Sequence, residues 1–234
     1  RGRATMEVGL QELLLLAVVA IAALLLLALR AGTRRSSGNT VMLFGPCDAG
    51  KSALALAMRF RRAVPTRASM CPTVGTCEIN GKAVEVIDVP GAGPLRAQML
   101  QHAARADLLL CVLDGTQVAA HAKDAAGMLF DVLTLEPVQS RAPGLVIVLN
   151  KSDQRGYAQL QAARTALEAE VQKVRLARTT MEDTSGKPKR ARGIGDASAG
   201  PFSFDSLGDV AFIAASAVQP TVKALEQAIS QRVR

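Results

Sequence analysis

The sequence contains few aromatic, histidine and cysteine residues. Among its 234 residues there are no Trp, one Tyr, six Phe, two His and four Cys. The cysteines, at positions 47, 71, 77 and 111, form no CxxC pair and have no histidines at the spacing of metal ligands. This pattern argues against a zinc module and gives no indication of a disulfide framework. The basic stripe interleaved with aromatic side chains that is typical of nucleic-acid binders is also missing.

Acidic residues are the minority among the charged residues, but the basic excess is local. The net charge is +8, with 28 Lys and Arg against 20 Asp and Glu. Residues 1–38 hold five basic and two acidic side chains, and four more basic residues lie close together at Lys187, Lys189, Arg190 and Arg192. The rest of the chain has 19 basic and 18 acidic residues. We therefore expect no direct binding of nucleic acid.

One long apolar run lies near the beginning of the sequence. Residues 13–29 read LLLLAVVAIAALLLLAL, which is 17 apolar residues in succession. At about 1.5 Å per residue they form roughly 26 Å of helix, and the flanking residues extend it toward the ~30 Å of a bilayer core. The run predicts a transmembrane helix over residues 10–31 that contacts membrane lipid. An N-terminal luminal tail, residues 1–9, would precede it, and a polar linker, residues 32–39, would follow.

A signal peptide and a buried helix are the two alternatives for this run. A signal peptide has a shorter apolar core, of about 7 to 15 residues, after a basic region, whereas here Glu7 and Glu12 precede the run. A buried helix of a soluble domain is the second alternative, but such helices are rarely apolar on every face. Because Arg30, Arg34 and Arg35 follow the run, the positive-inside rule places the C-terminal part in the cytosol.

Strand and helix patterns alternate through residues 40–234. Apolar and alternating stretches predict strands at residues 41–44, 76–79, 83–87, 108–114, 145–149 and 210–213. Asn80 and Gly81, between the second and third strands, form a strong hairpin signal. Helical periodicity predicts helices at residues 52–62, 98–105, 121–135, 157–178 and 222–233. We therefore expect an α/β domain with a mainly parallel central sheet flanked by helices.

One stretch interrupts the alternation. Residues 179–204 are rich in Gly, Ser, Pro and charge, with almost no apolar periodicity. This composition predicts a mobile surface insertion in the domain. Its basic run suits anionic lipid or ribosomal RNA, but a solvated loop is the favoured interpretation.

A phosphate-binding loop follows the first predicted strand. Residues 45–52 fit GxxxxGK[ST] and lie between an apolar strand and a helix, as this motif requires. In such loops backbone N–H groups surround the phosphates, the lysine reaches the terminal phosphates and the serine binds Mg²⁺. The predicted nucleotide-binding residues here are Gly45, Pro46, Cys47, Asp48, Ala49, Gly50, Lys51, Ser52 and Ala53.

Contacts with magnesium and the γ-phosphate are expected from two further segments. Asp88-Val-Pro-Gly91 fits DxxG, in which the carboxylate of Asp88 meets Mg²⁺ through water and the Gly91 N–H meets the γ-phosphate. Thr73 lies in Cys71-Pro-Thr-Val-Gly-Thr76, a loop expected between the first helix and the hairpin, and its hydroxyl is a candidate to close on Mg²⁺. The predicted magnesium ligands are thus Ser52, Thr73 and Asp88.

Guanine specificity is predicted after the fifth strand. Asn150, Lys151 and Asp153 fit NKxD, in which the aspartate accepts hydrogen bonds from two guanine donors that adenine lacks. Asn150 is expected to brace the phosphate loop, and the Lys151 stem is expected to cover the base. Ser216 and Ala217, after the last strand, are expected to offer a backbone N–H to guanine O6. The predicted cofactors are therefore GTP and Mg²⁺.

Hydrolysis of the nucleotide is expected to be slow. Many small GTPases place a glutamine directly after DxxG to orient the attacking water, but here Ala92 follows. His102 and His121 lie too far along the chain to be assigned as substitutes, and the sequence identifies no arginine finger. No catalytic residue is therefore predicted.

The motif order and the PTxG context of Thr73 resemble the Arf/Sar branch of small GTPases. Three features narrow the resemblance to the β subunits of the eukaryotic signal recognition particle receptor: the Gly-x-Cys-Asp-x-Gly-Lys loop, a span before the GTPase, and a polar insertion leading into Phe202-Ser-Phe204. Residues 123–133, KDAAGMLFDVL, are also similar to that family. The family's usual residue after DxxG is histidine, so Ala92 departs from the pattern.

The resemblance implies a P-loop small-GTPase fold and a single-pass subunit of the endoplasmic reticulum membrane with a cytosolic GTPase domain. It further implies that the GTP-bound switch loops, around Thr73 and residues 91–95, bind the N-terminal domain of the receptor α subunit. Ribosome and translocon would then be indirect partners in cotranslational targeting. A loop that is ordered by the nucleotide and forms a binding surface is a known kind of switch.

Two further functions stay open on the sequence alone. One is an Arf/Sar-like trafficking GTPase that cycles by hydrolysis and recruits coat proteins, but such proteins use an amphipathic, often lipidated N-terminal helix, whereas residues 13–29 are apolar all round. The other is a structural anchor with an inactive nucleotide site.

Overall fold

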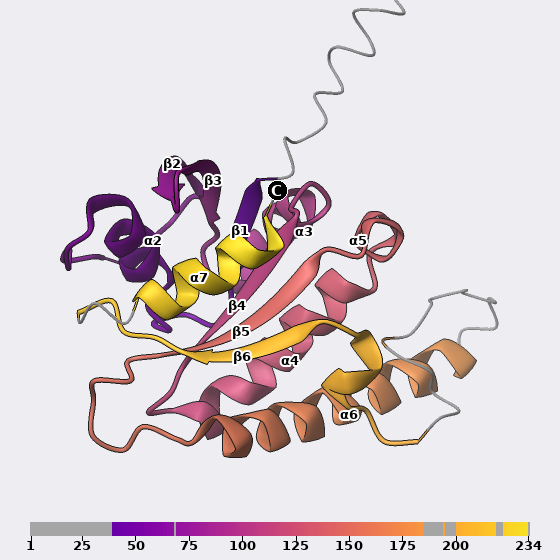
Figure 1. Ribbon diagram of the computed structural model, residues 1–234. Coiled ribbons are helices and arrows are strands. Elements are labelled where there is room, and N and C mark those ends of the chain that lie inside the picture. The colour runs from indigo at the N-terminus through magenta and orange to yellow at the C-terminus, as the bar shows by residue number, and fades with distance from the viewer. Residues whose placement is uncertain (1–38, 68, 185–193, 195–199, 219–221, 234) are drawn as a thin grey trace, which may run out of the picture. The chain divides into compact units, whose positions relative to one another are not determined.

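The computed structural model describes residues 39–67, 69–184, 194, 200–218 and 222–233 (Figure 1). Residues Gly38–Arg234 form one compact unit. The predicted span and luminal tail lie outside the described residues. Within the described ranges, no helix has both the length and the apolarity needed to cross a bilayer.

A six-stranded sheet forms the centre of this unit, in the order β2-β3-β1-β4-β5-β6. All neighbouring strands pair in parallel except β2 and β3, which form an antiparallel hairpin. Asn80 and Gly81 turn the hairpin with φ angles of 49° and 78°, the positive values that a type I′ turn requires. The strands are β1 Thr40–Phe44, β2 Thr73–Ile79, β3 Lys82–Asp88, β4 Leu108–Asp114, β5 Gly144–Asn150 and β6 Val210–Ala214.

Helices cover both faces of the sheet. Helices α2 and α7 pack on one face and α3, α4 and α6 on the other (Figure 1). Residues of β4 alternate between the two faces, and all seven are buried, which explains why this strand is a continuous apolar run. The helices are α2 Lys51–Phe60, α3 Arg96–Ala103, α4 Val118–Leu133, α5 Glu136–Arg141, α6 Leu160–Thr184 and α7 Val222–Arg232.

The predicted α/β architecture and mainly parallel sheet are confirmed, with differences at three places. The short helix α5 was not expected from the sequence; it begins with Pro137 in its first turn, a position that suits proline. The loop predicted over residues 71–76 is a loop only as far as Pro72, because Thr73 already pairs with Asp88 across the hairpin. The third difference concerns the insertion.

The described parts of the predicted insertion, residues 179–204, are helical or contain buried side chains. Helix α6 continues to Thr184, and the far end of the insertion is buried: Ile194, Phe202 and Phe204 are 2%, 5% and 1% exposed. The Phe204 ring packs edge-on against Phe202 at 5.1 Å and Phe212 at 5.2 Å between ring centroids. The prediction of a surface insertion is therefore wrong for these residues. Isolated apolar residues give no periodic pattern, so the sequence did not reveal that they are buried.

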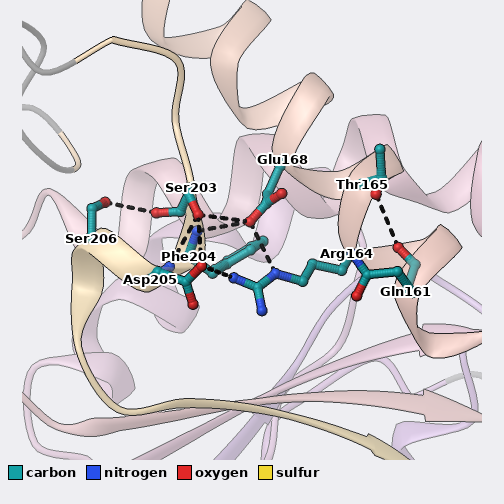
Figure 2. A network of polar contacts seen from close by, with 8 residues as sticks. All are labelled: Gln161, Arg164, Thr165, Glu168, Ser203, Phe204, Asp205 and Ser206. Carbon is teal, nitrogen blue, oxygen red and sulfur yellow. Dashed lines mark hydrogen bonds and ion pairs between the residues drawn. The ribbon is translucent and has the colours of Figure 1, made fainter.

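A polar network fixes the same end to α6 (Figure 2). Glu168 accepts hydrogen bonds from the Phe204 N–H at 2.9 Å and the Ser203 hydroxyl at 3.2 Å. Arg164, one turn earlier, pairs with both Glu168 at 3.1 Å and Asp205 at 2.6 Å. These contacts hold the chain against α6 directly before the short 3₁₀ helix η3, Phe204–Leu207, and strand β6.

Candidate functional site

The carboxyl ends of the parallel strands surround a cavity of about 360 Å³. Because β1, β3, β4, β5 and β6 end at one edge of the sheet, the loops that follow them meet there. Of the residues predicted from sequence, those that line the cavity are Cys47, Asp48, Gly50, Lys51, Ser52, Ala53, Gly91, Asn150, Lys151, Asp153 and Ala217. Four others, Gly45, Pro46, Ala49 and Ser216, are buried behind this lining.

The phosphate loop depends on glycines at its two ends. Gly45 has φ 138°, and a Cβ there would lie 2.2 Å from the Val112 carbonyl oxygen. Gly50 has φ 85°, and a Cβ there would lie 2.1 Å from Nδ2 of Asn150. Both positions exclude a side chain through backbone conformation and close contact. Gly91 of DxxG also touches the loop, since its Cβ would lie 2.6 Å from the Cys47 nitrogen.

Lys51 lies beneath the phosphate loop with its ammonium turned toward the backbone. It is 6% exposed, and Nζ donates to the carbonyl oxygens of Gly45 at 2.9 Å and Pro46 at 2.6 Å. Burial lowers the pKa of Lys51, while the nearby Asp88 carboxylate opposes this. A phosphate in the cavity would stabilise the charged form of this buried ammonium.

The metal end of the site, which we define as Ser52, Ser69 and Asp88, is held together by two short contacts. The Ser52 hydroxyl donates to Oδ2 of Asp88 at 2.6 Å and lies 2.9 Å from the Ser69 hydroxyl. Asp88 is 5% exposed, its Oδ1 is buried without a hydrogen-bond partner, and burial raises the pKa of its carboxyl. A buried carboxylate oxygen without a partner suits a hard cation.

The oxygens of Ser52 and Asp88 suit a Mg²⁺ site that water and phosphate complete, rather than a metal site built from protein ligands alone. No cluster of three or more His, Cys, Asp or Glu able to hold a metal occurs in the described part of the chain. Magnesium commonly uses one or two protein ligands and completes its shell with water and substrate phosphates. Ser52 and Asp88 are placed for that role. Thr73 is exposed and lines a neighbouring cavity of about 260 Å³ that also borders Ser52 and Asp88, so its contact with Mg²⁺ stays a prediction.

The base end of the site, which we define as Asn150, Lys151, Asp153 and Ser216, is built from two loops. Asn150 Nδ2 donates to the Ala49 carbonyl at 2.9 Å, so it braces the phosphate loop as expected. The Ser216 hydroxyl donates to Oδ1 of Asp153 at 2.5 Å, which holds this carboxylate at the cavity wall. The loops after β5 and β6 therefore position each other.

Lys151 has a partner that the sequence motif did not reveal. Its Nζ binds Oδ2 of Asp114 at 2.6 Å, and Asp114 is 1% exposed at the end of β4. Burial alone would raise the pKa of Asp114, but hydrogen bonds from Lys151 and Thr116 outweigh burial and lower it. The acidic residue that ends the apolar run of β4 was the only sequence signal for this pair. Asp114 fixes the Lys151 stem beside the cavity.

Sequence reasoning also missed three residues between α2 and β2. Thr66, Arg67 and Ser69 line the nucleotide cavity, although this segment carries no recognised motif. The two histidines are placed as expected: neither lines the cavity, and His121 instead accepts a hydrogen bond from the Asp114 N–H at 3.3 Å. Ala92 caps the 3₁₀ turn η1, Gly93–Leu95, and offers no group that orients water.

Comparison with known proteins identifies the family. The model of the signal recognition particle receptor beta subunit family matches residues 36–210. The chain is 28% identical to signal recognition particle receptor subunit beta of Mus musculus over 156 residues, which are 65% of this chain and 58% of that protein. It is 28% identical to the Dictyostelium discoideum protein of the same name over 184 residues, 77% of this chain and 63% of that protein. The chain therefore spans roughly three fifths of these relatives.

Solved structures show the same fold. A structure of the mammalian SRP receptor superposes with a TM-score of 0.69 at 24% identity, covering 83% of this chain and all of that one. An SRb-GTP/SRX complex from Chaetomium thermophilum gives 0.67 at 18% identity with the same coverage, and an SRb-GDP-Mg structure gives 0.62 at 19%, covering 83% and 99%. At these identities the likeness establishes a small-GTPase fold. Together with the family match, it shows that the chain belongs to the signal recognition particle receptor β-subunit family.

Proposed function

We propose that this protein binds GTP together with Mg²⁺ and is the regulatory GTPase subunit of a signal recognition particle receptor. The observation that carries the proposal is the hydrogen bond between Ser216 and Asp153 beside the phosphate loop, because it presents a carboxylate at the wall where a guanine edge would lie. Relatives solved with GTP and with GDP and magnesium support the choice of nucleotide and metal.

In the GTP state the protein docks the N-terminal domain of the receptor α subunit. Phe60 on α2, Met70 on the segment between α2 and β2, and Val74 on β2 are 50%, 80% and 48% exposed. Exposed apolar side chains that gather into one patch mark surfaces that bind proteins. A nucleotide that orders this segment would present these side chains to the partner.

The membrane anchor is the predicted span over residues 10–31, with the GTPase domain on the cytosolic side of the endoplasmic reticulum membrane. Its length and apolarity support this assignment. The full chain should resist extraction of membranes with alkaline carbonate. Release into the soluble fraction would contradict a span.

Hydrolysis is slow on this proposal, because Ala92 cannot orient water. A single-turnover assay on the full chain should give a rate far below that of an activator-stimulated GTPase. A rate that matches a stimulated enzyme would contradict this part of the proposal.

The main test is a pull-down from detergent extract with the chain loaded with GTP or GDP. We expect recovery of the receptor α subunit with GTP only, and loss of recovery with Lys51→Ala, which removes the buried ammonium. Lys123→Ala is the matched control, since Lys123 is exposed on α4 and lines no part of the cavity. Equal recovery with both nucleotides would remove the switch from the proposal.

A further inference from the structure

Three cationic side chains line the nucleotide cavity, and they differ in their partners. Lys51 donates to two loop carbonyls, and Lys151 is paired with Asp114. Arg67, on the segment between α2 and β2, also lines the cavity and is exposed. It makes no ion pair or hydrogen bond with another described residue. One cation at the cavity is therefore available to a ligand.

The position of Arg67 favours one end of a bound nucleotide. Asn150, Lys151 and Asp153 of the base end line the nucleotide cavity but not the neighbouring one. Arg67 borders both this cavity and the neighbouring one under β2, as does Ser52. It also lies two residues before Ser69, whose hydroxyl is 2.9 Å from that of Ser52. Arg67 thus lines the same two cavities as Ser52, the residue that would bind Mg²⁺.

We infer that Arg67 binds the terminal phosphate of the nucleoside triphosphate and so distinguishes GTP from GDP. Planar guanidinium groups bind phosphate through two parallel hydrogen bonds. A diphosphate ends before this position and leaves the guanidinium in solvent. This inference rests on the proposed function, since it assigns a further residue to the same nucleotide.

A contact from Arg67 to the terminal phosphate would also transmit the nucleotide state. In the sequence, Arg67 comes between Phe60 and Met70, which are two of the exposed apolar residues of the proposed docking surface. Anchoring Arg67 restricts the chain between them. The backbone conformations available to a partner surface are then fewer with GTP bound than with GDP bound, which lowers the entropy cost of docking.

Equilibrium binding of a non-hydrolysable GTP analogue and of GDP to the full chain in detergent with Mg²⁺ tests the inference. Arg67→Ala should weaken binding of the analogue on the order of 10-fold and change GDP binding less than about two-fold. Arg67→Lys should recover part of the loss, because it restores the charge without the planar fork. Arg62→Ala is the matched control: Arg62 is exposed on the same segment and lines neither cavity.

The outcomes separate this inference from the proposed function. Unchanged binding of the analogue by Arg67→Ala, or an equal loss for analogue and GDP, would overturn the inference alone. The same holds if Arg62→Ala reproduces the effect, because general surface charge would then explain it. Failure of the unchanged protein to bind either nucleotide would overturn the proposed function and this inference with it.

Discussion

The base end and the metal end of the site differ in how their side chains are partnered. At the base end Asn150 Nδ2 binds Ala49, Lys151 binds Asp114 and Ser216 binds Asp153, although Oδ1 of Asn150 is buried without a hydrogen-bond partner. At the metal end Asp88 Oδ1 is buried without a partner, and the flanking segment presents Arg67 without a described partner and exposed apolar side chains. On the proposed function, the base end would be organised before the nucleotide binds, whereas the nucleotide and its Mg²⁺ would complete the metal end.

This difference indicates how affinity and switching are divided. On the proposed function, a preorganised base end would bind GTP and GDP alike, because both carry the same base and the groups of this end lose little freedom on binding. The metal end would sense what differs between the two nucleotides, the terminal phosphate and its Mg²⁺. A variant at the base end should therefore affect both nucleotides, and a variant at the metal end should separate them.

The largest effect is expected at the base end with Asp153→Asn. The amide places a donor against a guanine donor, so the affinity for both GTP and GDP should fall about 100-fold or more. Titration with fluorescent nucleotides measures this. Asp124→Asn, on the exposed face of α4, is the control that should leave affinity unchanged. A loss for GTP alone would break the proposed division between the two ends.

Asn150→Ala tests whether the base end is preorganised without nucleotide. Removing the buried hydrogen bond to the Ala49 carbonyl should lower the free energy of unfolding by about 2 kcal/mol, measured by urea denaturation of the nucleotide-free protein. Asn39→Ala removes a similar amide-to-carbonyl bond, from Asn39 to Ala83, which is exposed to solvent although Asn39 itself is half-buried. That control should cost less than about 1 kcal/mol. If both variants lowered the free energy of unfolding equally, the buried bond of Asn150 would contribute no more to stability than the exposed bond of Asn39.

Asp88→Asn should have the smallest effect on stability and a distinct effect on the metal. Burial raises the pKa of this carboxyl above its usual 3.8, so the nucleotide-free protein loses stability as pH rises through the raised pKa and Asp88 ionises. At neutral pH Asp88→Asn should therefore unfold no more easily than the unchanged protein. Mg²⁺ should raise the affinity of this variant for GTP about 10-fold less than it raises the affinity of the unchanged protein. If the variant without nucleotide were markedly less stable than the unchanged protein, the proposal that Mg²⁺ completes the metal end would be contradicted.

Local features of the sequence predicted the phosphate loop, the hairpin and most strands. Gly45 and Gly50 need conformations that other residues avoid, Asn80 and Gly81 form the turn of the hairpin, and β4 is apolar because both of its faces are buried. Each signal lies within a few neighbouring residues, so it can be read without the fold.

Other features depended on contacts between distant segments. Helix α6 continues beyond the residues predicted for it, and Phe202 and Phe204 are buried although their segment resembles a solvated insertion. The sequence motifs gave no role to Asp114 or to Arg67, although Asp114 pairs with Lys151 and Arg67 lines the nucleotide cavity. Which partner each side chain meets depends on residues far along the chain, and the sequence around it carries no signal of that partner.

The type of fold and the order of the nucleotide motifs can be predicted from the amino-acid sequence alone, because they follow from backbone preferences and short spacings. Which groups act together depends on the folded arrangement of the chain. Asn150 braces Ala49 across 101 positions of sequence, and Ser216 holds Asp153 across 63. Such pairs form because parallel strands deliver their carboxyl ends to one edge of the sheet. The same edge left one oxygen of Asp88 without a partner, and local sequence preference did not specify this.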